Sequence, residues 1–198
     1  MKLVSSFTLA LGLGVAILAV NQTSTPALAQ DSADWKPKWT DGGELILPEG
    51  YREWVYLGSP LTPNALNGGQ AGFPEYHNVY VHPSAYAIYK ETKEFPEGTI
   101  LLKELQLTME AQEDDGSRSE VSGRGYFPGA FNGIDISVKD STRFSESQNW
   151  GFFNFGHHAP PYAATAAAAP VEGCAQCHID NADEDMVFSR FYQVLGTH

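Results

Sequence analysis

Apolar and polar side chains alternate most clearly between residues 98 and 111, and this alternation predicts a β-strand. One face of that strand would carry Thr99, Leu101, Lys103, Leu105, Leu107 and Met109. The other face would carry Ile100, Leu102, Glu104, Gln106, Thr108 and Glu110. Lys103 therefore lies among leucines, where an ammonium group is costly unless it is neutral, paired or chemically used. The alternative is an edge position from which Lys103 extends its charge into water.

Four other segments have the composition of strands, and they are 78–82, 121–127, 131–138 and 149–155. In the third of them, Ile134, Ile136 and Val138 share one face, so Asp135 lies on the opposite face. Residues 51–57 fit either a helical turn or a strand, because their periodicity does not separate the two.

Two segments predict helices. Residues 83–93 begin with a proline, which is favoured in a first helical turn. Apolar residues recur at helical spacing between 181 and 195, which predicts a terminal helix. Between the strands, the Gly-, Pro- and Asn-rich residues 58–76 predict a long ordered loop. The expected fold class is α+β, predominantly antiparallel β-sheet with a few flanking helices, in a single domain.

The N-terminus has the pattern of an export signal. An apolar run extends from Leu3 to Val20 and precedes a small-x-small cleavage signal at residues 27–29. We interpret residues 1–29 as a signal peptide, which predicts a periplasmic location for the mature domain of residues 30–198. The alternative is an uncleaved membrane anchor, because the run is about long enough to span a bilayer.

The 198-residue chain is acidic, with a formal net charge of −12. Removing the leader with its single charged residue, Lys2, changes −12 to −13. Such a charge argues against nucleic acid or an anionic membrane surface as a partner. A basic redox partner would suit it, although an acidic surface also serves solubility alone.

The only two cysteines, Cys174 and Cys177, are followed directly by His178. This C-x-x-C-H spacing is typical of a c-type haem attachment site, in which both thiols bond one porphyrin and the histidine is an axial ligand of the iron. We therefore predict one covalently bound haem c with His178 as its metal ligand. The export signal agrees with this, because c-type haem is attached outside the bacterial cytoplasm.

Three other interpretations of the cysteine pair are weaker. A thioredoxin-like redox site needs its first thiol at a helix N-terminus and does not need a following histidine. A disulfide between residues so close in sequence would close a small, strained loop that stabilises little. A zinc site would need more clustered ligands than this sequence places near the pair.

Several segments of the sequence resemble the cytochrome P-460 family, in the same order and over nearly all of the mature chain. These segments are residues 51–55, 61–64, 78–81, 98–105, 137–140, 149–153, 174–178, 187–188 and 191–192. Several of them are unrelated to haem attachment, so together they are specific. The related cytochrome c′-beta proteins share the β-rich fold but bind gases.

Members of the cytochrome P-460 family carry a mono-haem c centre whose porphyrin is cross-linked to a lysine, and they oxidise hydroxylamine. The resemblance implies that Lys103 is this lysine, which agrees with its position among leucines. It also implies that Asp135 is the distal carboxylate that accepts a proton from bound hydroxylamine, where the family has a glutamate that is one methylene longer. Phe73 matches a distal-pocket aromatic residue, with ordinary core packing as the alternative.

The resulting hypothesis is an exported cytochrome that oxidises hydroxylamine to nitrogen oxides at an open distal iron site and passes electrons to an electron-accepting cytochrome. A gas-binding protein would have the same five-coordinate haem, bind nitric oxide and lack the lysine cross-link. An electron carrier would need a sixth protein ligand to the iron. The candidate histidines are His77, His82, His157 and His158. We expect each of them at the surface. A homodimer is left open by the sequence.

Overall fold

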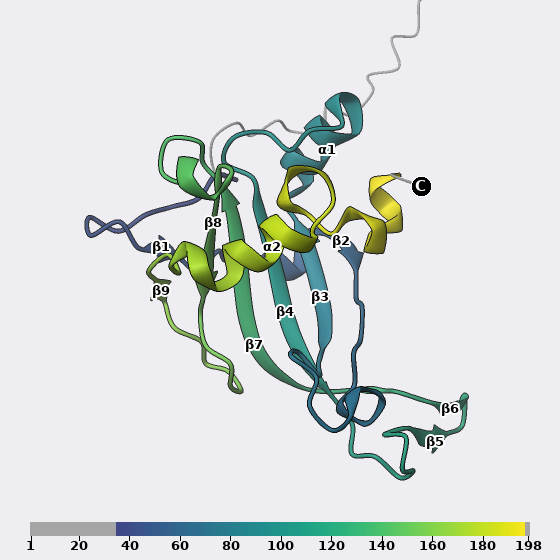
Figure 1. The fold of residues 1–198 in the computed structure, drawn as a ribbon. Coiled ribbons are helices and arrows are strands. Elements are labelled where there is room, and N and C mark those ends of the chain that lie inside the picture. Colours follow the sequence, from purple (N-terminus) through teal and green to yellow (C-terminus); the bar gives the residue numbers. More distant parts are fainter. Residues whose placement is uncertain (1–34, 197–198) are drawn as a thin grey trace, which may run out of the picture. The chain divides into compact units, whose positions relative to one another are not determined.

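A five-stranded antiparallel sheet organises the protein in its computed structural model, which describes residues 35–196, all within one compact unit (Figure 1). The strand order is β2-β3-β4-β7-β8. These strands are β2 (Val55–Gly58), β3 (Tyr76–Val81), β4 (Ile100–Thr108), β7 (Pro128–Lys139) and β8 (Trp150–Asn154). The α+β class and the antiparallel sheet expected from the sequence are confirmed. The predicted signal peptide, residues 1–29, lies outside the described residues.

Smaller elements complete the fold. Two short two-stranded ladders pair β1 (Leu45–Ile46) with β9 (Thr165–Ala166) and β5 (Arg118–Glu120) with β6 (Gly123–Gly125). The α-helices are α1 (Pro83–Thr92) and α2 (Gln176–Asn181), and η4 (Val171–Ala175) is a turn of π-helix. Six short 3₁₀ turns are described: η1 (Tyr51–Glu53), η2 (Asn64–Asn67), η3 (Ser145–Ser147), η5 (Glu184–Met186), η6 (Ser189–Phe191) and η7 (Gln193–Leu195). Within residues 35–196, no helix is long and apolar enough to cross a membrane.

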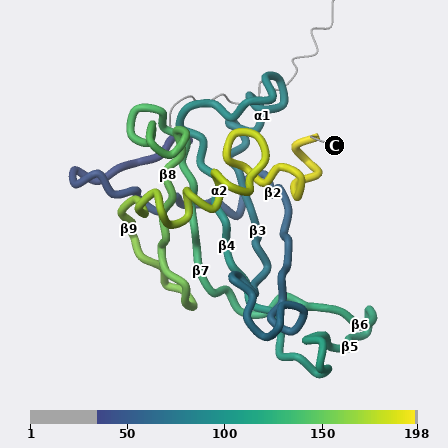
Figure 2. The backbone as a smooth tube through the Cα atoms, in the orientation of Figure 1, coloured from purple at the N-terminus to yellow at the C-terminus, as the bar shows by residue number. Residues whose placement is uncertain are grey.

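Both faces of the central strand β4 are covered, so its alternating side chains enter two separate cores. Leu101 belongs to the first core, together with residues of α1 and of the chain after α2. Leu102 belongs to the second core, with Ile134 and Ile136 of β7 and with residues of β1 and β9. Figure 2 follows the chain after β9 as it crosses the first face through α2. The functional residues described below lie on this first face.

Two sequence-based predictions are wrong in detail. The expected terminal helix over 181–195 is a series of 3₁₀ turns, because Asp185 and Met186 adopt left-handed backbone angles (φ 55° and 61°) that end any helix. The expected strand over 121–127 is mostly a turn and the short β6. The alternation along 131–138 is confirmed, since Ile134, Ile136 and Val138 pack together in the second core.

The charge buried most completely in the sheet is Glu104, whose side chain has no exposed surface. Its carboxylate accepts hydrogen bonds from Tyr51 Oη at 2.6 Å and from Arg52 Nη2 and Nε at 2.6 and 3.2 Å. Burial and the bond to Glu104 raise the pKa of Tyr51. A carboxylate buried in this way is tolerated only while its donors satisfy it.

Replacing Arg52 by leucine should therefore destabilise the protein on the order of 3 kcal/mol, because the ionised Glu104 would lose its cationic partner. Urea unfolding of the wild type and of Arg52→Leu would measure the difference. The matched control is Arg124→Leu, which removes an arginine from a solvent-exposed pair with Asp115 and should change stability little. Equal losses in both variants would contradict the argument.

Candidate functional site

A cavity of about 570 Å³ lies on the first face of the sheet and is bounded by the chain after β9. Its lining includes all six residues that the sequence analysis singled out: Phe73, Lys103, Asp135, Cys174, Cys177 and His178. They come from the loop before β3, from β4, from β7, and from the η4 and α2 turns. The structure thus brings together residues that are far apart in the sequence.

The C-x-x-C-H motif spans the junction of η4 and α2. Cys174 lies within the π-helical turn η4, and Cys177 and His178 lie in the first turn of α2. Both thiols are free and exposed, so no disulfide joins them. Partial desolvation of the Cys174 sulfur and the charge of the nearby Asp135 carboxylate raise the pKa of Cys174, which makes this thiol a poor candidate for a thioredoxin-like nucleophile.

The ring of His178 is held in a fixed orientation. Its Nδ1 lies 2.7 Å from the Met186 carbonyl oxygen and donates to it, which leaves Nε2 as the nitrogen free to bind a metal. Phe152 and Phe188 pack against the ring, with centroids at 4.5 and 4.9 Å. Burial lowers the pKa of His178, so the neutral form that ligates metals is favoured.

The position of the Met186 carbonyl depends on a strained turn at residues 185–186, which side chains from two strands stabilise. Asp185 and Met186 both lie in the left-handed region, which costs free energy for residues other than glycine. The Asp185 carboxylate accepts hydrogen bonds from Lys139 Nζ at 2.7 Å and from Trp150 Nε1 at 3.0 Å. Strands β7 and β8 therefore help to orient His178 through this turn.

Lys103 and Asp135 face each other across β4 and β7, where they are register partners. Lys103 Nζ lies 3.0 Å from Asp135 Oδ2 and 4.0 Å from the centre of the Phe73 ring. Burial would raise the pKa of Asp135, but the Lys103 charge and its hydrogen bond, with help from His157 and Asn154, hold that pKa below its ordinary value. Asp135 is therefore a carboxylate at neutral pH.

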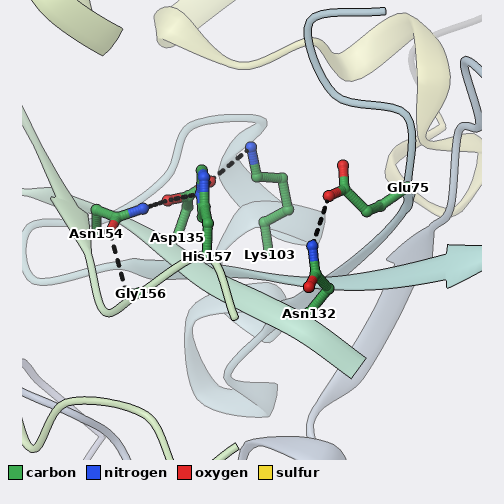
Figure 3. A network of polar contacts seen from close by, with 7 residues as sticks. All are labelled: Glu75, Lys103, Asn132, Asp135, Asn154, Gly156 and His157. Atoms are coloured by element: carbon green, nitrogen blue, oxygen red, sulfur yellow. Dashed lines mark hydrogen bonds and ion pairs between the residues drawn. The ribbon is translucent and has the colours of Figure 1, made fainter. Parts of the chain in front are cut away.

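Two further contacts to Asp135 come from a segment that the sequence analysis did not assign to the site (Figure 3). Asn154 Nδ2 donates to Asp135 Oδ1 at 2.8 Å, and His157 Nε2 lies 3.1 and 3.2 Å from the two carboxylate oxygens. His157 lies in irregular chain after β8, where no hydrophobic pattern marks a functional position. It reaches Asp135 because β8 pairs antiparallel with β7, with Asn154 opposite Asp135.

The surface position expected for His77 is wrong, because this residue lines the cavity and its Nε2 is buried without a hydrogen-bond partner. Burial and the Lys103 charge lower its pKa to about 4, which a hydrogen bond to the Phe73 backbone only partly offsets. A signal was present in the sequence, since His77 precedes the buried Val79 and Val81 at strand spacing.

The other histidines proposed as iron ligands lie elsewhere. His82 caps α1, where its Nδ1 accepts from Ser84 N at 3.1 Å. His158 directs Nδ1 to the Ala159 carbonyl at 2.7 Å. Of the four candidates, His77 alone is part of the cavity lining.

The residues present fit a covalently attached haem. Two free thiols and an oriented imidazole lie on one wall of a cavity that is large enough for a cofactor, and the lining is rich in aliphatic and aromatic side chains. Among residues 35–196, no group of three or more His, Cys, Asp or Glu side chains is placed to hold a bare metal ion.

The depressed pKa of His77 predicts a loss of stability in acid. The unfolded chain binds a proton at this histidine near pH 6.5, whereas the folded protein does so only near pH 4, so the free energy of unfolding should fall as the pH drops through that window. Glutamine does not titrate, so the free energy of unfolding of His77→Gln should fall less in acid than that of the wild type. Melting temperatures of both holoproteins at pH 7 and pH 4.5 test this, and parallel losses would contradict it.

Comparison with known proteins agrees with the geometry. The sequence model of the Cytochrome P460 family matches residues 48–189, which include the sheet and the C-x-x-C-H motif. No curated protein matches the chain. The family is one of haem cytochromes associated with hydroxylamine oxidation. Because the match covers well over half of the sequence, the chain belongs to the Cytochrome P460 family.

Proposed function

We propose that this protein is an exported mono-haem c-type cytochrome that oxidises hydroxylamine to nitrogen oxides at an open distal iron site. The observation that carries the proposal is the shared cavity, in which Lys103 and Asp135 line the same space as Cys174, Cys177 and His178. A family member that only carried electrons would have no use for an ionised carboxylate in this space.

On the proximal side, Cys174 and Cys177 would hold the porphyrin through thioethers, and His178 would hold the iron through Nε2. When bound, the haem supplies an iron that takes up electrons from the substrate. The hydrogen bond to the Met186 carbonyl keeps His178 Nδ1 protonated and its ring in one orientation. The surrounding aromatic rings restrict water at this side.

On the distal side, Asp135 is the proposed general base. It is ionised, and its hydrogen bonds fix the position of the carboxylate before a substrate arrives. It would accept a proton from hydroxylamine while electrons leave the substrate. Before a haem is attached, the Lys103 ammonium group balances the negative charge of this carboxylate, and the Phe73 ring covers it.

Location and partners follow as further parts of the proposal. Residues 1–29 would direct export to the periplasm, the compartment in which c-type haem is attached. The small-molecule substrate would be hydroxylamine, and the electrons would pass to an electron-accepting cytochrome. The net charge of −12 favours a basic docking surface on that partner.

A gas-binding function is the second candidate, and one observation favours it. The Lys103 ammonium group is paired with Asp135 at 3.0 Å and stacked on Phe73 at 4.0 Å, an arrangement that also suits a lysine without any covalent bond to a porphyrin. In that case the protein would bind nitric oxide reversibly and would not turn over hydroxylamine.

Haem peptides separate these two functions. If Lys103 is cross-linked, digestion of the denatured holoprotein should release haem joined to three peptide sites, at Lys103, Cys174 and Cys177, as measured by mass spectrometry. Lys103→Met should lose the third attachment and keep the other two. Haem joined only to the cysteines in the wild type would favour the gas-binding function.

Replacing the proposed base should abolish most of the turnover. Asp135→Asn keeps the size of the side chain but removes its negative charge, so hydroxylamine oxidation with an artificial electron acceptor should fall by at least about 100-fold. The visible spectrum should stay near that of the wild type, because Asp135 is not expected to bind the iron.

The matched control is Asp41→Asn, which changes an exposed carboxylate outside the cavity and should leave turnover unchanged. Lys103→Met adds a second readout. Without the Lys103 hydrogen bond, burial should raise the pKa of Asp135. As the pH is lowered, any remaining activity should therefore disappear at a higher pH than in the wild type. Unchanged turnover in Asp135→Asn would remove this residue from the mechanism.

A further inference from the structure

Asp135 is poorly placed to exchange protons with bulk water by itself. Its side chain is 19% exposed, and Lys103, Asn154 and His157 occupy its carboxylate oxygens. A base that accepts a proton in every reaction cycle must also release one. One of these three partners is therefore expected to carry the proton away.

The chemistry of the three partners singles out His157. The Asn154 amide has no proton that titrates. Lys103 lines the cavity, so its nitrogen would return a proton to the space that the substrate occupies. An imidazole can accept a proton at one ring nitrogen and release another from its second nitrogen. The His157 side chain is 43% exposed, so it joins the buried carboxylate to solvent.

The backbone around His157 allows this contact. Gly133 has a φ of 157°, and a Cβ there would lie 2.8 Å from the Gly156 carbonyl oxygen and 3.1 Å from His157 Cδ2. The Gly156 carbonyl accepts a hydrogen bond from Ile134 N at 3.2 Å. Only a residue without a side chain at position 133 lets the chain after β8 come this close to β7.

We propose that His157 carries the proton from Asp135 to solvent, an inference that rests on the proposed oxidation of hydroxylamine. The bond from hydrogen to the substrate breaks as an O–H bond forms on Asp135. That O–H bond then breaks as His157, in its Nδ1–H tautomer, gains the proton at Nε2, and the imidazolium releases the Nδ1 proton to water. The ring is left with Nε2–H donating to the ionised carboxylate, and it returns to the Nδ1–H tautomer by proton exchange with solvent before it accepts the next proton.

The charged groups around this pair favour transfer in the outward direction. The Lys103 nitrogen lies 3.0 Å from Asp135 Oδ2, and an N–H donor at this place stabilises the ionised carboxylate, so Asp135 tends to pass on a proton. His77 is also near, and its neutral ring adds no charge at neutral pH. The next residue, His158, contacts the Ala159 carbonyl through Nδ1. Phe73 packs edge-on against His157 at 5.9 Å and closes one side of the route.

The test compares His157→Gln with His158→Gln in the holoprotein. A glutamine at 157 can still donate a hydrogen bond to Asp135 but cannot carry a proton, so turnover of hydroxylamine should fall at least about tenfold. Nitric oxide affinity of the ferrous protein should stay unchanged, which would exclude a general loss of structure. His158→Gln should behave as the wild type. In His157→Ala, added imidazole should restore part of the turnover.

A second measurement does not use activity. The NMR signals of the His157 ring nitrogens in the diamagnetic ferrous carbonyl protein should change when Asp135 becomes asparagine, because Nε2 lies 3.1 and 3.2 Å from the two carboxylate oxygens. Unchanged ring-nitrogen signals, or normal turnover in His157→Gln, would overturn the role of His157 alone. A wild-type protein without any hydroxylamine turnover would instead overturn the proposed function, and this inference with it.

Discussion

The pairing of Lys103 with Asp135 connects the fold to the site. The two residues are register partners on adjacent central strands, so a shift of one residue in the β4–β7 pairing would place their side chains on opposite faces of the sheet. In the native register they neutralise each other at the cavity wall. A cation and an anion can then lie beside an apolar cavity with a smaller desolvation penalty than either would have alone.

The opposite face of β4 also buries a charged residue, which is stabilised by hydrogen bonds from a different part of the chain. Glu104, the neighbour of Lys103, is completely buried, and donors from Tyr51 and Arg52 satisfy its carboxylate. This network has no access to the cavity lining and has a structural role. One strand thus presents adjacent charges of opposite sign to two faces, and the cavity lies on the face of Lys103.

Much of the fold was predictable because its strands alternate and its first helix begins with a proline. The sequence-based predictions of secondary structure are wrong where long-range contacts override the local hydrophobic pattern. The segment after α2 has helical spacing of apolar residues, but Asp185 is held in a left-handed turn by Lys139 and Trp150, which are distant in sequence. That turn directs the Met186 carbonyl to His178, so the exception to the local pattern serves the candidate site.

The candidate haem-attachment groups could be identified from local sequence, because Cys174, Cys177 and His178 are close neighbours whose spacing is typical of c-type haem attachment. The surroundings of this candidate site depend on tertiary contacts. His77 and His157 reach the cavity region through strand register and through the close approach of two chain segments, and neither property is local. Local patterns predict which face a residue occupies, whereas partners across the sheet are set by how separate strands align.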